Sequence, residues 1–220
     1  MVEIQISDSI KIVLPEMRLG CLHAQVVISH SSEEQIEYTG KMIQDVQKLL
    51  SIENVSKSEI INSTKEAYRK LGKDPSRYRP SAEALTRRII QGKGLYQVNN
   101  VVDALNCNSI QTGFSIGGYD TTRLEDPVLF GVGKANELYE AIGRGKLNIE
   151  NLPLLRDSKG AFGSPTSDSI RSCVNDTTTS FLMIFFDFSG SQKLYAAMDD
   201  AVNLLKRFCG VIESEIKVIS

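Results

Sequence analysis

One segment of this chain has to be buried on both of its sides. Residues 181–188 read FLMIFFDF, an almost unbroken run of bulky apolar side chains. Such a run is typical of a strand that is covered on both faces of its sheet. A helix is expected over about residues 192–209, where apolar residues recur at helical spacing before Gly210, and a last strand over about 211–219.

The N-terminal part predicts three strands followed by two helices. The strands are expected at about residues 2–6, 10–14 and 20–29. The first helix is expected to begin at Ser31, with Glu34 three residues on, and the second at Ser56, with Glu59, each a capping-box pattern. Because strands and helices do not alternate regularly, we expect one α+β domain over residues 1–220, with a mixed, mostly antiparallel sheet core and flanking helices.

Composition places the chain among ordinary globular proteins. Charged residues make up 24% of its 220 residues, and no apolar stretch approaches the roughly 20 residues of a membrane span. The four cysteines are far apart and there are only two histidines, so we expect no metal site and no cofactor. The N-terminus lacks a signal pattern. We therefore expect a cytoplasmic protein without a membrane partner.

Positive charge is concentrated in one segment of a chain whose net charge is −2. Residues 65–93 hold nine Lys or Arg against three Asp or Glu. A helix is expected from Pro80 to about Gln91, in which Glu83 and Arg87 form either a weak surface pair or part of an RNA contact. The candidate RNA-binding residues are Lys73, Arg77, Arg79, Arg87 and Arg88.

A row of polar residues follows. Asn99, Asp103 and Asn106 are spaced by four and three residues, so a helix places them on one face. Such a row either binds a ligand or satisfies the backbone groups of neighbouring elements. The glycines of residues 110–160 match neither GxxxxGK[ST] nor a strand-coupled GxGxxG, which disfavours nucleotide hydrolysis and dinucleotide binding.

Two sequence blocks resemble a known family. The pattern YRxxGxDPxxYRPSAEALxRR, continued by NxVVDxxNxxS and IGGYD, is similar to the B3/B4 domain of the phenylalanyl-tRNA synthetase beta subunit in a free-standing form. A second block, SPTSDSIRSCVNDTT over residues 164–178, resembles the distal part of that domain. The motif-bearing core spans about residues 65–185.

The resemblance implies an editing function. In the synthetase this domain hydrolyses tyrosine that has been wrongly esterified to phenylalanine tRNA. That chemistry requires a pocket that places water against an ester carbonyl, donors for the oxyanion and a polar group for the tyrosine hydroxyl. The implied partner is tRNA or aminoacyl-tRNA.

The sequence departs from the family pattern at two positions. Gly117 stands where the resemblance implies a pocket histidine, and Ile184 stands where it implies the glutamate that recognises tyrosine. Both departures weaken tyrosine editing specifically, while they leave tRNA binding untouched.

The loop before VNDTT carries the candidate site residues. Asp168 is the candidate catalytic residue, which could position water, and Thr178 matches a family threonine at the pocket edge. The substrate-binding candidates are Asn99, Asp103, Asn106, Ser167, Ser169, Arg171 and Thr178. Asp168 and Ser169 are equally compatible with turn and helix-cap roles.

The leading hypothesis is a tRNA-associated B3/B4 domain that binds the acylated end of a tRNA and hydrolyses a mischarged aminoacyl ester in trans. The alternatives are a non-catalytic module that binds tRNA or an amino-acid-like ligand, and a synthetase-associated interaction protein. The chain has no room for the ATP and amino-acid site of an aminoacylating enzyme.

Overall fold

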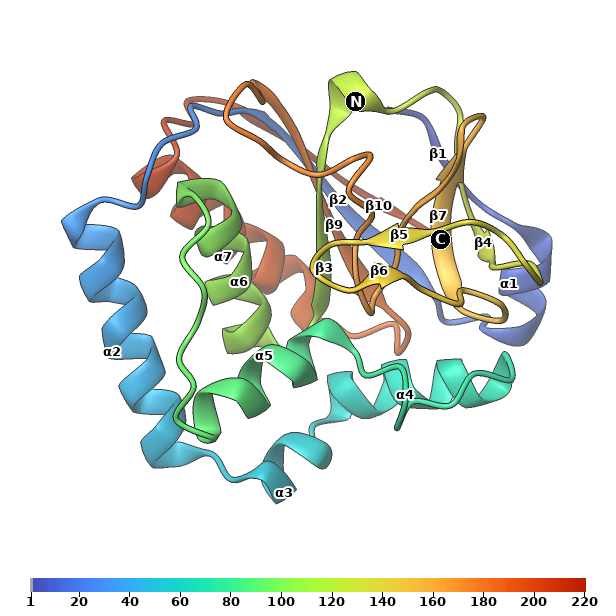
Figure 1. The fold of residues 1–220 in the computed structure, drawn as a ribbon, viewed down its shortest axis with the longest axis horizontal. Helices are drawn as coiled ribbons and strands as arrows, with labels where there is room; N and C mark the ends of the chain where they lie inside the picture. Colours follow the sequence, from blue (N-terminus) through green and yellow to red (C-terminus); the bar gives the residue numbers. More distant parts are fainter. Residues whose placement is uncertain (1) are drawn as a thin grey trace.

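A four-stranded antiparallel sheet forms the centre of the molecule (Figure 1). In the computed structural model, which describes residues 2–220, its strands run in the order β10 (Ser214–Ile219), β2 (Arg18–Gln25), β9 (Ser180–Asp187) and β3 (Ser115–Asp120). Strand β9 contains most of the apolar run, and all of its residues after Ser180 are buried, which confirms the prediction of a strand covered on both faces.

Alternate residues of β9 enter two different cores, as the period of two along a strand requires. Met183 and Phe185 pack with the helices on one face of the sheet. Leu182, Ile184 and Phe186 pack on the other face, against a second sheet.

The second sheet contains β1 (Ile4–Ile6), β4 (Val128–Val132), β7 (Pro153–Asp157) and β8 (Gly160–Gly163), in that order. Strands β1 and β4 pair in parallel, while β4, β7 and β8 pair antiparallel. A short hairpin of β5 (Glu140–Ala141) and β6 (Gly145–Lys146) lies beyond it. The expected α+β fold with a mixed, mostly antiparallel core is therefore confirmed.

Helices cover the face of the central sheet opposite the second sheet (Figure 1). They are α2 (Glu33–Leu49), α5 (Ser81–Ile90), α6 (Asn100–Thr112) and α7 (Lys193–Phe208). Helix α4 (Glu59–Lys70) follows the short α3 (Ile52–Ser56) and runs with α5 along the lower edge in Figure 1. The expected helices near residues 80–91, 99–109 and 192–209 are confirmed.

Three local predictions were wrong. Residues 10–14 were expected to form a strand, but they belong largely to helix α1 (Asp8–Val13), in which Ile10 is buried while Ile12 is 81% exposed. The buried residues of this segment, Ile10 and Leu14, are four apart, which is helical spacing, whereas a strand would bury Ile10 and Ile12 on one face. The N-cap of α2 is Ser32, because the hydroxyl of Ser31 is bonded to Asp103.

The second helix also begins later than expected. Ser56 ends α3, and its hydroxyl donates to the carbonyl of Ile52 instead of capping a helix. Helix α4 begins at Glu59 with Ser58 as its N-cap residue. A 3-10 turn (Thr121–Arg123) follows β3. None of the helices in residues 2–220 is long and apolar enough to cross a membrane.

Candidate functional site

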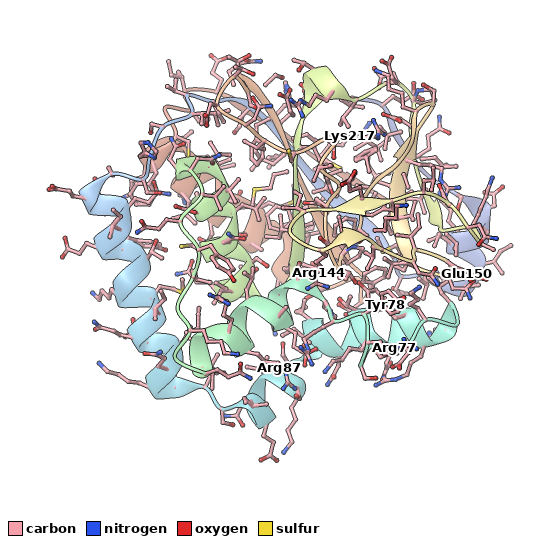
Figure 2. The ribbon with its side chains drawn as sticks, in the orientation of Figure 1. Arg77, Tyr78, Arg87, Arg144, Glu150 and Lys217 are labelled. Atoms are coloured by element: carbon pink, nitrogen blue, oxygen red, sulfur yellow. The ribbon has the colours of Figure 1, made fainter. Side chains whose placement is uncertain are left out.

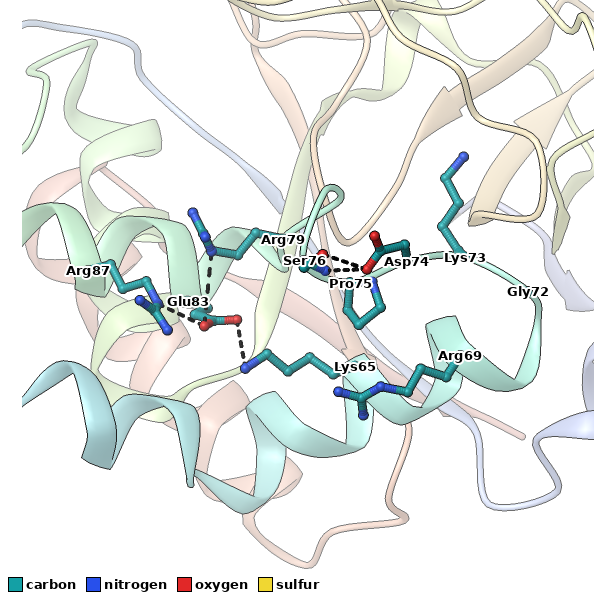
Figure 3. A pocket seen from close by; sticks show the side chains of 10 residues that line it. All are labelled: Lys65, Arg69, Gly72, Lys73, Asp74, Pro75, Ser76, Arg79, Glu83 and Arg87. Atoms are coloured by element: carbon teal, nitrogen blue, oxygen red, sulfur yellow. Dashed lines mark hydrogen bonds and ion pairs between the residues drawn. The ribbon is translucent and has the colours of Figure 1, made fainter.

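A groove of about 550 Å³ lies between helix α4, the turn that follows it and helix α5 (Figure 3). Its lining residues come from the basic segment that the sequence singles out. They are Lys65, Arg69, Gly72, Lys73, Asp74, Pro75, Ser76, Arg79, Glu83 and Arg87. The lining therefore carries five basic side chains against two acidic ones.

Local sequence explains the shape of the groove. Helix α4 ends where Gly72 adopts a φ of +84°, a conformation that residues with a Cβ rarely take. Asp74 then accepts hydrogen bonds from the backbone N–H and the hydroxyl of Ser76, at 2.9 and 2.7 Å. This turn brings the chain back, so that α5 runs beside α4.

Glu83 is the centre of the basic cluster. Its side chain is only 2% exposed, yet it lies 2.8 Å from Nε of Arg87, 3.1 Å from Nζ of Lys65 and 4.0 Å from Nε of Arg79. Arg79, Glu83 and Arg87 are four residues apart on or next to α5, so they form one row. Arg87 also donates to the hydroxyl of Ser56 at 2.7 Å. The i, i+4 pair of Glu83 and Arg87, one of the two alternatives, is present, but it is not a weak surface pair, because Glu83 is a buried carboxylate shared by three cations.

Lys73 has a structural role that the sequence did not indicate. Its Nζ donates to the carbonyls of Asn148 and Glu150, at 2.8 and 2.6 Å, and lies 3.7 Å from the centre of the Tyr78 ring. Burial lowers the pKa of Lys73. Figure 3 shows its side chain pointing away from Glu83. The ammonium group therefore ties the turn before β7 to the groove wall.

The other candidate RNA-binding residues do not all line the groove. Arg79 and Arg87 line the groove, whereas Arg77 is exposed next to it (Figure 2). Arg88 lies 4.0 Å from the centre of the Tyr96 ring and donates to the carbonyl of Lys93, so it faces away from the groove lining. Two further cations, Lys65 and Arg69 of α4, line the groove. The sequence indicates them only as part of the general positive charge of residues 65–93.

Asp168 lies on the other side of the molecule's central strands from α6. Its carboxylate accepts a hydrogen bond from the hydroxyl of Tyr119 at 2.7 Å and another from the backbone N–H of Gly118 at 3.2 Å. Burial raises the pKa of Asp168 to about 7, against the opposing effect of these hydrogen bonds. Burial, together with Asp168, also raises the pKa of Tyr119 well above its usual value, so its hydroxyl remains a donor.

The loop that carries Asp168 is fixed to both walls of the groove. The hydroxyl of Tyr68 in α4 lies 2.8 Å from Oγ1 of Thr166, and the N–H of Ser81 at the start of α5 donates to the carbonyl of Pro165. The hydroxyl of Tyr139 donates to the carbonyl of Ser167 at 2.7 Å. The basic groove and the Asp168 loop are therefore adjacent parts of one region.

Several predicted substrate-binding residues hold the fold together. Arg171 donates to Asp157 at 2.5 Å and to the carbonyl of Gly160, so it clamps the β7–β8 hairpin. Thr178 is buried and donates to Asp120 at 2.8 Å. The two predicted serines are the chain neighbours of Asp168. Ser169 is buried and Ser167 is partly exposed.

The row on α6 belongs to different surroundings. Asn99 is the N-cap of the helix, and its side chain accepts from the N–H of Val102. Asp103 and Asn106 line a small cavity shared with α2. Helix α6 packs in the helical core, whereas Tyr119 packs in the core on the other face of the central sheet. The structure therefore separates Asp103 and Asn106 from the Asp168 loop.

These features define a class of protein, namely an α+β domain with two main sheets whose basic groove adjoins a loop with a partly buried carboxylate. A family model of the B3/4 domain matches residues 63–210, which is more than half of the chain. The chain therefore belongs to the B3/4 domain family. Among the residues described, no group of three His, Cys, Asp or Glu side chains is placed to hold a metal ion.

Chains similar to this one are found among the solved structures. An N-terminal fragment of the phenylalanyl-tRNA synthetase beta-subunit from Pyrococcus horikoshii is similar, with 14% sequence identity and a TM-score of 0.48. The similarity covers 100% of this chain and 50% of that fragment, so the chain spans about half of the fragment's length. A search of curated proteins found no match.

Proposed function

We propose that this protein binds the acylated end of a tRNA through the basic groove and the adjoining Asp168 loop. The observation that carries the proposal is the cluster of Lys65, Arg79 and Arg87 around one buried glutamate. Phosphate oxygens are the ligands that such clusters of lysine and arginine recognise. The identity of the ligand as tRNA is supported by membership of the B3/4 family and by the resemblance of the motif blocks to the synthetase domain.

The charges of the groove favour an anion. Glu83 offsets part of the charge of the three cations that surround it, while Arg69 is exposed and adds a further positive charge. The side chain of Arg79 is 43% exposed, and its Nε lies 4.0 Å from Glu83, which is longer than a hydrogen bond. Its guanidinium therefore retains free donors for a phosphate. Because Glu83 holds these groups before a ligand arrives, less conformational freedom is lost on binding.

The direct test is tRNA binding at two salt concentrations. Phosphate contacts release counterions, so affinity should fall steeply as salt rises. The double variant Arg69→Ala, Arg79→Ala should bind about tenfold or more weakly at low salt, with a salt slope smaller by about two. The matched control is Lys41→Ala, Lys48→Ala, which removes two exposed cations of α2. Equal affinities for the two double variants would contradict the proposal.

Ester hydrolysis is the second candidate function, and the raised pKa of Asp168 favours it. A carboxyl group that titrates near neutral pH can accept a proton from attacking water. Asp168 lies in a loop held to both groove walls by Tyr68 and Ser81, so a tRNA in the groove would bring its acylated end near this carboxyl.

Deacylation of a panel of mischarged tRNAs tests this second candidate. Tyrosyl-tRNA for phenylalanine should be a poor substrate, because a hydroxyl is selected strongly only by groups that hydrogen-bond it. A smaller or more apolar amino acid is expected, and Asp168→Asn should reduce the rate while tRNA affinity stays nearly constant. Rapid, tyrosine-selective deacylation would contradict this. If no ester is hydrolysed, the non-catalytic binding module remains.

The cysteines support a cytoplasmic location as part of the proposal. Cys21, Cys107, Cys173 and Cys209 are all free in the structure. Free thiols suit a reducing compartment.

A further inference from the structure

A small cavity lies between helix α2, residues 95–97 and helix α6. Its volume is about 160 Å³, and it is the place where the predicted polar row of α6 meets the N-terminal half of the chain. The lining residues are Ser31, Ile36, Thr39, Gly40, Ile43, Leu95, Tyr96, Gln97, Asp103 and Asn106. Half of them precede residue 63, where the match to the B3/4 domain begins.

The polar end of this cavity is the carboxylate of Asp103. The residue is 7% exposed, and its two oxygens accept hydrogen bonds from the hydroxyl of Ser31 at 2.6 Å and the N–H of Val98 at 3.0 Å. Both donors are neutral. Among the residues that the structure describes, no lysine, arginine or histidine forms an ion pair with Asp103.

Three other buried carboxylates of the same chain have cationic partners. Asp187 pairs with Arg18 at 2.8 Å, Asp157 with Arg171 at 2.5 Å, and Glu83 with Lys65 at 3.1 Å. A buried carboxylate is costly unless an opposite charge compensates it. Asp103 lies in the first turn of α6, where the helix N-terminus favours its charge, but no side-chain cation of the described residues accompanies it, so its carboxylate can accept a bound cation.

The remaining walls of the cavity are mostly apolar. Ile36 and Tyr96 are 44% and 68% exposed, and Ile43 and Leu95 are partly buried against the helical core. Asn106 also lines the cavity, three residues after Asp103 and therefore on the same face of α6. The cavity thus combines a carboxylate with aliphatic and aromatic surface.

Gly40 keeps the cavity open. It lies in the middle of α2, where glycine destabilises a helix relative to alanine. A Cβ added at Gly40 would meet no atom within 4 Å. The fold therefore does not require glycine at this position for close packing, and the missing side chain contributes space to the cavity.

We propose that this cavity binds a small primary amine that carries a branched apolar group. The ammonium group would donate to Asp103 and to the side-chain oxygen of Asn106, and the apolar group would contact Ile36, Ile43 and Tyr96. The cavity is smaller than the roughly 300–1,000 Å³ of most ligand sites, which limits the ligand to a short side chain.

Titration with isoamylamine, followed by the amide chemical shifts of the wild-type protein, tests the proposal. Isoamyl alcohol has the same carbon skeleton without the charge, and it serves as the matched ligand control. The amine should bind with a dissociation constant on the order of 1 mM or lower, and shifts should be largest for Gly40, Tyr96 and Asp103. The alcohol should bind at least tenfold more weakly.

Two variants separate the polar and apolar contributions. Asp103→Asn should weaken amine binding about tenfold or more. Gly40→Leu fills the cavity and should abolish binding, while its melting temperature stays equal to or above that of the wild type, since leucine favours a helix. No binding of the amine at tens of millimolar, equal binding of amine and alcohol, or undiminished binding by Gly40→Leu would each overturn the proposal.

Discussion

Gly117 and Ile184 are direct partners across the β3–β9 strand pair. Residues directly opposite each other in an antiparallel pair project on the same face of the sheet. Here that face carries Tyr119, whose hydroxyl is 1.9 Å from the position that a Cβ on Gly117 would occupy. Tyr119 fills the space above Gly117 and bonds to Asp168. The glycine, the buried isoleucine and the Tyr119–Asp168 pair therefore form one connected feature of the domain.

Replacing Gly117 should be costly because of Tyr119. Gly117→Ala is expected to destabilise the protein by about 1–3 kcal/mol, as overpacking does in well-packed cores. In a Tyr119→Val background the same change should cost at least about 1 kcal/mol less, because residues in contact couple. Gly131→Ala is the control, since a Cβ there meets only Ser7 at 3.6 Å. Urea unfolding of the four proteins of the cycle measures the coupling, and strict additivity would contradict the argument.

The sequence predicts the layered fold better than it predicts element boundaries. FLMIFFDF identifies β9 because a strand of this composition is stable only when both faces are covered. Residues 10–13 belong to helix α1, because the buried residues Ile10 and Leu14 are four apart while Ile12 is exposed. Ser31 is not the N-cap of α2, because its hydroxyl donates a hydrogen bond to Asp103, 72 residues later in the chain. Contacts of that range are not visible in a local pattern.

Lys73 should matter for stability and not for RNA binding. Lys73→Met keeps the length of the side chain but removes the two hydrogen bonds to the carbonyls of Asn148 and Glu150. A loss of about 1–3 kcal/mol of unfolding free energy is expected. The affinity for tRNA should change by less than about threefold, because the ammonium group is already occupied. Lys70→Met, at an exposed position, is the control for loss of charge.

Glu83 should stabilise the groove walls. In Glu83→Gln the cations of Lys65 and Arg87 lose a buried partner, so a loss of about 2 kcal/mol is expected from urea unfolding. Glu59→Gln disrupts an ion pair with Lys193 whose partners are about 70% exposed, and it should cost less than about 0.5 kcal/mol. Similar values for the two variants would show that the cluster around Glu83 is energetically equivalent to a surface pair.

The candidate site could be predicted only in part. Periodicity places Arg79 and Arg87 on one side of α5, which is why both line the groove. The same reasoning cannot separate Lys73 from them, because its partners are carbonyls some 75 residues later. Asn99 and Asn100 are both buried, but Asn99 caps α6, whereas Asn100 bonds to Ser29, Val27 and Phe208. Neighbouring asparagines look alike until the tertiary structure assigns their partners.

Asp168 should make the protein less stable as pH rises from about 4 to about 7. Burial raises its pKa to about 7 in the folded protein, whereas an unfolded chain loses this proton near pH 4. Between these values the folded state binds more protons than the unfolded state, so the free energy of unfolding falls as pH increases. The stability that the neutral carboxyl contributes is present below about pH 4 and is lost by the time pH passes about 7.

The variant Asp168→Asn is neutral at every pH and should lack this slope. The unfolding free energy of the variant minus that of the wild type should increase by on the order of 1–3 kcal/mol as pH rises from 4 to 8. Asp176→Asn, at an exposed position, should retain the wild-type slope. Urea unfolding at four or five pH values measures these slopes, and a carboxyl-carbon titration by NMR reports Asp168 directly. If Asp168 titrates near pH 4, or if Asp168→Asn keeps the slope, then Tyr119 and Gly118 stabilise the charged carboxylate more than burial opposes it.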